Sequence, residues 1–200
     1  MRKKLFALIL CLGMYQGLLA QNFGGGISLG ANISQVDGDA FGGFNQGGVS
    51  VGGFVYYPLA KQLFLQPEIN FDQLGSAAGG FLVLRTTHIS VPVLLKLALP
   101  VELGNSTQEL LFHIGPVFGY LLSARDFNLD QTQNLNRIDY RAVAGVSYRF
   151  SRRTSFLIRY GYSVVSFVPT NVSPVSIIAQ GRTGLAHNYV HLSLRFHLID

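Results

Sequence analysis

Residues 192–198 read Leu-Ser-Leu-Arg-Phe-His-Leu, so leucine or phenylalanine at each even position alternates with serine, arginine or histidine. Successive side chains of a β-strand point to opposite faces, and this stretch therefore predicts a strand with one apolar and one polar face. The stretch 138–150 repeats the pattern, and its charged residues Asp139, Arg141 and Arg149 all fall on one face. Such strands separate two different environments.

Alternation of this kind, read together with turn residues, predicts eight strands. They are expected at 23–34, 47–57, 62–73, 87–99, 108–122, 137–150, 153–165 and 187–198. Three connections are short, at 58–61, 100–107 and 151–152, and four are long, at 35–46, 74–86, 123–136 and 166–186. An even number of strands, short periplasmic turns and longer external loops are typical of bacterial outer-membrane barrels.

The composition indicates which face of the strands points outward. The chain is 48% hydrophobic and contains 23 glycines and nine tyrosines, which suits strands that face lipid. About ten residues per strand, rising roughly 3.3 Å each at a tilt near 40°, span an apolar band of about 25 Å. We therefore expect an all-β fold, an eight-stranded antiparallel transmembrane β-barrel with short periplasmic turns and four longer external loops.

The N-terminus predicts export. Basic residues at positions 2–4 precede an apolar run from Leu5 to Leu19, which is typical of a secretory signal peptide. The expected division is a signal peptide at 1–20 and an outer-membrane barrel domain at 21–200. Removal of the signal peptide would also remove Cys11, the single cysteine, so the exported chain would form no disulfide.

The net charge of +5 shrinks on export. Three of the 15 basic residues lie in the predicted signal peptide, which leaves 12 basic against 10 acidic residues and a balance of +2. Nucleic-acid binding therefore loses its main support in composition. The expected surroundings are outer-membrane lipid, with other envelope proteins as candidate partners.

The polar face carries charges of both signs. An eight-stranded barrel leaves an interior just wide enough for side chains, and an unpaired buried charge is costly. We expect a structural ion-pair network that fills the lumen, with a proton or solute pathway as the alternative, and with Arg159 and Arg195 paired to Glu68 or Glu109. The candidate members are Glu68, Asp72, Lys96, Glu109, Asp139, Arg141, Arg149, Arg159 and Arg195.

No catalytic or metal motif has convincing spacing, and we expect no catalytic residue, cofactor or metal. His187 and His191 are four residues apart, which on a strand is roughly 13 Å and too far for shared metal ligation. His191 and Ser193, with a carboxylate such as Glu68, could form the Ser-His-acid set of a lipid-modifying barrel enzyme. That enzyme remains the catalytic alternative.

The loop 166–186 is unusually apolar for an external connection. It predicts either a contact surface for another protein or a flap that packs over the barrel mouth. The residues of this candidate partner-binding loop are Phe167, Val168, Val172, Val175, Ile177 and Ile178.

Seven stretches in chain order resemble the PorT-like family of outer-membrane β-barrel proteins found in Bacteroidetes, and the most specific feature within them is the combination of Glu68, 92–96, Gly115-Pro116 and Arg159-Tyr160. They are 26–34, 65–71, 88–96, 115–122, 144–148, 158–161 and 188–196. The resemblance implies a membrane barrel, and the family's named member is linked to the machinery that secretes proteins across the outer membrane. It supplies no catalytic residues. The expected function is a non-enzymatic scaffold or secretion accessory, and the binding-protein rival is a soluble, lipocalin-like periplasmic barrel with its charges outward.

Overall fold

A computed structural model describes residues 23–39, 42–79, 81–103, 106–126, 129–130, 132–133, 135–168 and 184–199. The predicted signal peptide lies outside the described residues, so its cleavage remains a prediction. No helix in this described part is long and apolar enough to cross a membrane.

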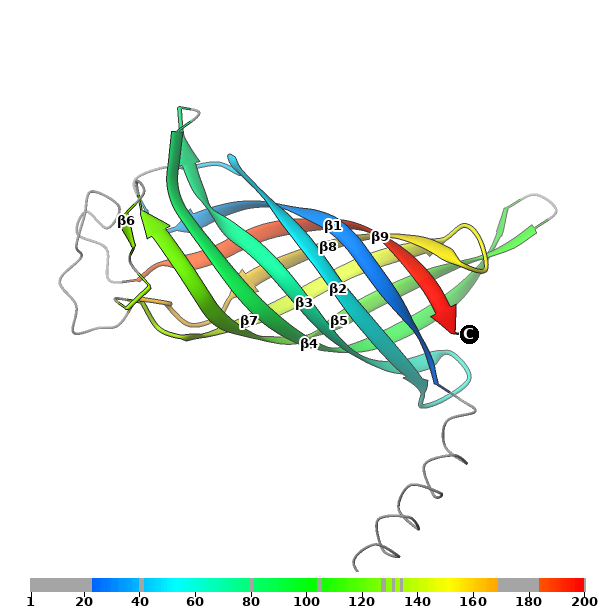
Figure 1. Ribbon diagram of the computed structural model, residues 1–200. Helices are drawn as coiled ribbons and strands as arrows, with labels where there is room; N and C mark the ends of the chain where they lie inside the picture. The colour runs from blue at the N-terminus through cyan, green and yellow to red at the C-terminus, as the bar shows by residue number, and fades with distance from the viewer. Residues whose placement is uncertain are drawn as a thin grey trace, which may run out of the picture.

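Eight long strands form one closed antiparallel sheet (Figure 1). The strand order is β4-β3-β2-β1-β9-β8-β7-β5, and pairing of β4 with β5 closes the barrel. The predicted eight-stranded antiparallel barrel is therefore confirmed. The strands are β1 (Gly24–Asp37), β2 (Gln46–Pro58), β3 (Leu63–Ala78), β4 (Phe81–Leu103), β5 (Ser106–Asp126), β7 (Ile138–Arg149), β8 (Thr154–Ser163) and β9 (Ala186–Ile199), and the two-residue β6 (Leu129–Asp130) pairs with the end of β5.

The first and last long strands of the barrel meet at one seam. Leu29 of β1 lies opposite Leu194 of β9, and the pairing continues along the strands, with one irregularity between Gly25 and Gly26. Because every neighbouring pair is antiparallel and the number of long strands is even, β1 begins at the end of the barrel where β9 finishes (Figure 1). The longer connections lie at the opposite end, which we call the outer end.

The apolar face points outward and the polar face lines the interior. In β9, Leu194 is 44% exposed, whereas its neighbour Arg195 is 2% exposed. β7 alternates in the same way, with Tyr140 exposed beside the buried Asp139 and Arg141. An apolar wall around a polar lumen is the arrangement of a barrel that spans a membrane. The soluble, lipocalin-like alternative is therefore wrong, because it requires the charges to face outward.

The expected boundaries of two connections are wrong. The turn residues and the period-two pattern predict a long external connection at 74–86, but β3 continues to Ala78 and β4 begins at Phe81. The chain needs only a tight turn there, and Gly79 supplies its left-handed conformation at φ 57°. The hairpin of β3 and β4 still projects at the outer end (Figure 1). At the other end, the predicted turn at 100–107 is also mostly strand, because β4 runs to Leu103 and β5 starts at Ser106.

Candidate functional site in the barrel lumen

The predicted charged residues fall into two groups. Glu109 and Arg149 form a pair 3.5 Å apart near the end of the barrel where β1 begins and β9 finishes, and their side chains are 46% and 19% exposed. The others are buried in the lumen, and they are Glu68, Asp72, Lys96, Asp139, Arg141, Arg159 and Arg195.

Glu68 is the centre of the lumen network. Arg159 donates to both carboxylate oxygens of Glu68, at 3.0 and 2.9 Å, and Arg195 Nη2 donates to Oε1 at 2.5 Å. Gln66 and Asn70, which flank Glu68 on the same face of β3, donate at 2.7 and 3.1 Å. Bidentate arginine contacts to a carboxylate are among the strongest hydrogen bonds in proteins. We call this arrangement the Glu68 clamp.

The clamp ties together strands that are not neighbours in the sheet. Glu68 comes from β3, whereas Arg159 and Arg195 come from the adjacent strands β8 and β9, and β1 and β2 stand between the two groups. The contacts therefore cross the interior. Removal of one member of such a buried network leaves the others as uncompensated charges.

Aromatic rings hold the cations below the clamp. The guanidinium of Arg195 lies 4.1 Å from the ring centre of Phe54. Lys96 Nζ lies 4.6 Å from the ring centre of Tyr56 and donates to Gln66 Oε1 at 3.0 Å. Cations over aromatic faces are stabilised by the ring quadrupole. This part of the lumen is filled by side chains.

A second polar layer lies above the clamp, toward the outer end. Asp72 accepts hydrogen bonds from Ser50 Oγ at 2.6 Å and from Asn32 Nδ2 at 3.4 Å. Asn32 Oδ1 lies 2.9 Å from His191 Nδ1. A cavity of about 10 Å³ is left among Asp72, Arg159 and His191, which is about the smallest space that holds a water molecule.

A third layer closes the outer end of the lumen. Asp139 Oδ2 lies 3.0 Å from His187 Nδ1 and 3.2 Å from Arg141 Nε, and Arg141 also donates to Ser90 Oγ at 2.7 Å. Gly119 makes room for this arginine, because a Cβ there would lie 2.3 Å from Arg141 Nη2. Among the described residues, three layers of buried polar groups thus follow one another along the lumen.

Phe167 covers this third layer. Its ring stacks on His187 with ring centres 4.2 Å apart, and it packs in a buried cluster with Val36, Val83, Leu84 and Leu185. Its backbone N–H donates to the carbonyl of Leu185 at 3.0 Å. Phe167 was predicted as part of a partner-binding loop, but its buried ring packs over the barrel mouth, as the flap interpretation expected.

The remainder of that loop is only partly described. Val168 is half-buried against the same cluster as Phe167. Val172, Val175, Ile177 and Ile178 lie outside the described residues, so their partner-binding role remains a prediction.

The residues of the alternative catalytic set, His191, Ser193 and Glu68, are not linked by hydrogen bonds. His191 Nδ1 contacts Asn32, and Ser193 Oγ, although buried, has no hydrogen-bond partner in the described part of the chain. Glu68 is bound by Arg159 and Arg195. A Ser-His-acid mechanism requires the serine, the base and the acid to be linked by hydrogen bonds, and these residues do not make them.

Several lumen residues were missed by the sequence interpretation. Gln66 and Asn70 share the period-two positions of Glu68 and Asp72, so the same alternation could have found them. His88 and His187 could not be recognised as neighbours, because they are 99 positions apart and lie on strands that face each other across the lumen; their ring centres are 5.2 Å apart.

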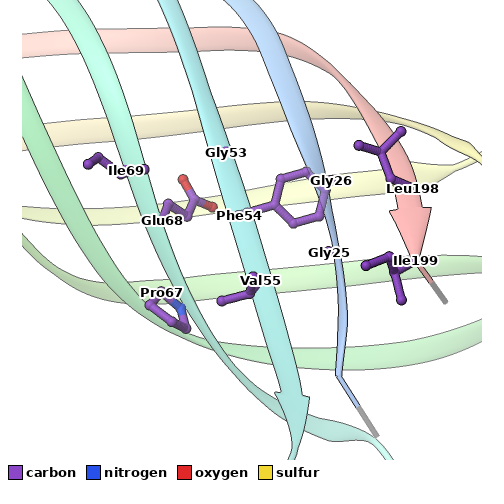
Figure 2. A pocket seen from close by; sticks show the side chains of 10 residues that line it. All are labelled: Gly25, Gly26, Gly53, Phe54, Val55, Pro67, Glu68, Ile69, Leu198 and Ile199. Carbon is purple, nitrogen blue, oxygen red and sulfur yellow. The ribbon is translucent and has the colours of Figure 1, made fainter. Parts of the chain in front are cut away.

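The outer wall carries a hollow near the end of the barrel where β1 begins and β9 finishes. Figure 2 shows its lining, in which Gly25 and Gly53 leave space beside the exposed side chains of Val55, Ile69 and Leu198. Its volume is about 490 Å³. Because the lining exposes almost no polar surface, the hollow offers space for apolar groups and no chemistry.

A protein-family model described as "Outer membrane protein beta-barrel domain" matches residues 5–180. Among solved structures, Neisserial surface protein A (NspA) is 10% identical with a TM-score of 0.48, covering 87% of this chain and 95% of its own. Ail, the attachment invasion locus protein of Yersinia pestis, is 12% identical with a TM-score of 0.46, covering 88% and 99%. The outer membrane protein OprG of Pseudomonas aeruginosa is 12% identical with a TM-score of 0.41, covering 89% and 95%. The comparison with curated proteins gives no match.

Proposed function

Because the chain belongs to the outer membrane protein beta-barrel domain family, we propose that it is a non-enzymatic scaffold or accessory whose closed barrel presents external loops to partner proteins. The chain is an outer-membrane protein, and its apolar wall meets membrane lipid. In this proposal, the external loops carry the function and the lumen does not.

The Glu68 clamp is the observation that carries this proposal. Glu68, Arg159 and Arg195 are all buried and bound to one another across the barrel interior. Opening a path for solute would require these charges to separate in a space with little water, at a high cost in free energy. A filled lumen supports a structural role over a solute pathway.

The external loops are the proposed partner surface. At the outer end, the connection 164–185 is the longest, and its residues Val172, Val175, Ile177 and Ile178 are apolar. Phe167 anchors the first part of this connection to the barrel mouth. The resemblance to the PorT-like barrels favours a partner from the secretion machinery of the outer membrane.

Crosslinking in intact outer membranes, followed by affinity purification of the tagged protein, tests the proposal. We expect envelope proteins to be recovered with the wild type and lost when 170–182 are replaced by a glycine-serine linker. The matched control replaces 103–106 in the β4–β5 hairpin at the opposite end, and it should retain the partners. Recovery of the barrel alone from wild-type membranes, with the crosslinker shown to be active, would contradict the scaffold function.

A further inference from the structure

We propose that the outer end of the lumen is a binding site for one divalent transition-metal ion, of which Zn²⁺ is the best-fitting example. The ligands are His88 of β4, Asp139 of β7 and His187 of β9, and one ligand atom from each lies within 4.8 Å of the others. All three side chains are at most 1% exposed. Two imidazoles and one carboxylate are a ligand set found in catalytic zinc sites, where a fourth position is left open.

Unpartnered atoms support a ligand at this position. Among the described residues, His88 Nδ1 and Asp139 Oδ1 are buried and have no hydrogen-bond partner. Buried polar atoms in native proteins are nearly always paired with protein, water or an ion. A metal ion bound by Asp139 Oδ1 and by the imidazole of His88 supplies what these two side chains lack.

The surrounding hydrogen bonds prepare His187 for the same ion. His187 Nδ1 lies 3.0 Å from Asp139 Oδ2, and its Nε2 lies 2.9 Å from Thr86 Oγ1. When the ion takes Nδ1, the contact of this nitrogen with Asp139 Oδ2 is replaced by the bond to the metal, and a proton on Nε2 is donated to Thr86 Oγ1. The ring then keeps its orientation, as metal-bound histidines usually do through their second nitrogen.

The charge around the site selects the kind of ion. Arg141 Nε lies 3.2 Å from Asp139 Oδ2, so a cation must bind beside a guanidinium. Ca²⁺ and Mg²⁺ bind mainly through several oxygen ligands, and one carboxylate partly neutralised by arginine is a poor site for them. Imidazole nitrogen is a ligand that suits Zn²⁺ and the neighbouring transition metals. The site therefore favours Zn²⁺ over Ca²⁺ and Mg²⁺.

Phe167 controls access from outside. Its ring stacks on His187 and, with Leu185 and Val36, separates the three ligands from the outer end of the barrel. An ion entering from the outside passes when this side chain moves. Phe167→Ala should therefore speed Zn²⁺ uptake in stopped-flow measurements while the ligands stay in place.

Titration of the untagged, detergent-folded barrel with ZnCl₂ in a calorimeter tests the proposal. We expect one saturable site per barrel and a rise in melting temperature with Zn²⁺, because an ion that binds only the folded state stabilises it. His88→Ala should weaken binding by at least about 10-fold. The control His113→Ala removes another lumen histidine, which is bonded to Ser147 and lies outside the site, and it should bind Zn²⁺ like the wild type.

Co²⁺ absorption gives a second measurement. Wild-type protein should show the visible bands of a Co²⁺ ion bound by two imidazoles and one carboxylate. These bands should be absent from His88→Ala or, where that variant does not fold, from His88→Gln. Absence of saturable Zn²⁺ binding to the wild type would overturn the proposal. So would equal affinity in the wild type and the His88 variants, which would place the ion elsewhere, or an equal loss in His113→Ala.

Discussion

Arg159 holds the carboxylate of Glu68 with both terminal nitrogens, at 3.0 and 2.9 Å, although the two residues are 91 positions apart in the chain. The contact joins β3 to β8 through the interior of the barrel. Together with Arg195, which approaches the same carboxylate, it makes the middle of the lumen a structural element.

Glu68→Ala should lower the free energy of unfolding by about 3–5 kcal/mol, because it leaves Arg159 and Arg195 as buried charges without their carboxylate. Urea titration of the barrel in lipid vesicles measures this change. The matched control is Glu109→Ala, which breaks the partly exposed pair with Arg149 and should cost less than about 1 kcal/mol. Similar losses for both variants would show that the clamp contributes no special stability.

The orientation of the strands can be tested with two adjacent positions in β9. A spin label at Leu194→Cys should be relaxed strongly by oxygen dissolved in lipid, because Leu194 is exposed on the apolar wall. A label at Ser193→Cys should be protected from oxygen, because Ser193 is buried in the lumen. The reverse pattern would mean that the strand faces are assigned the wrong way round.

Gly119→Ala should destabilise the barrel by about 1–3 kcal/mol, because the new Cβ would lie 2.3 Å from Arg141 Nη2. Arg141 cannot move away without losing its contacts to Asp139 and Ser90. The control Gly47→Ala adds a methyl group where no atom lies within 4 Å, and it should be nearly neutral. A double-mutant cycle with Arg141→Ala measures the coupling, and an additive result would contradict the steric explanation.

The pKa of Asp130, in β6 outside the membrane-spanning strands, is lowered because Thr132 donates to it through its hydroxyl and its backbone N–H. A folded-state pKa below the unfolded value means that this contact stabilises the connection above the unfolded pKa. The contribution is lost as pH falls through the folded pKa. We expect Thr132→Ala to raise the pKa of Asp130, measured by NMR titration, and Thr132→Ser to leave it low. An unchanged pKa in Thr132→Ala would exclude the hydroxyl as the cause.

The number of strands, and which face of each strand points outward, could be predicted from the sequence because both depend on the alternation of apolar and polar residues along a short stretch. Leu194 and Arg195 show their two environments from residue type alone. The extra length of β3 and β4 could not be predicted in the same way. Glycines such as Gly75 and Gly79 indicate a loop, whether the strand ends at them or continues through them. In the structure, Gly75 stays inside β3 and only the tip at Gly79 turns.

The sequence predicts which charged residues line the lumen, but it does not predict which of them pair with one another. Glu68 and Glu109 both lie on the polar face, and the sequence does not tell which of them meets Arg159, because that depends on how far each strand is staggered around the barrel. The stagger places Glu68 against Arg159 and Arg195, and leaves Glu109 to Arg149. The same stagger brings His88 and His187 together, which spacing along the chain could not indicate.

Single-barrel conductance in a planar lipid bilayer tests most directly the claim that this barrel is a closed scaffold. The filled lumen predicts no steady ion current through the wild type, because the buried side chains of Glu68, Arg159 and Arg195 block its middle. A stable ohmic current through wild-type barrels would contradict the account and would favour a solute or proton pathway.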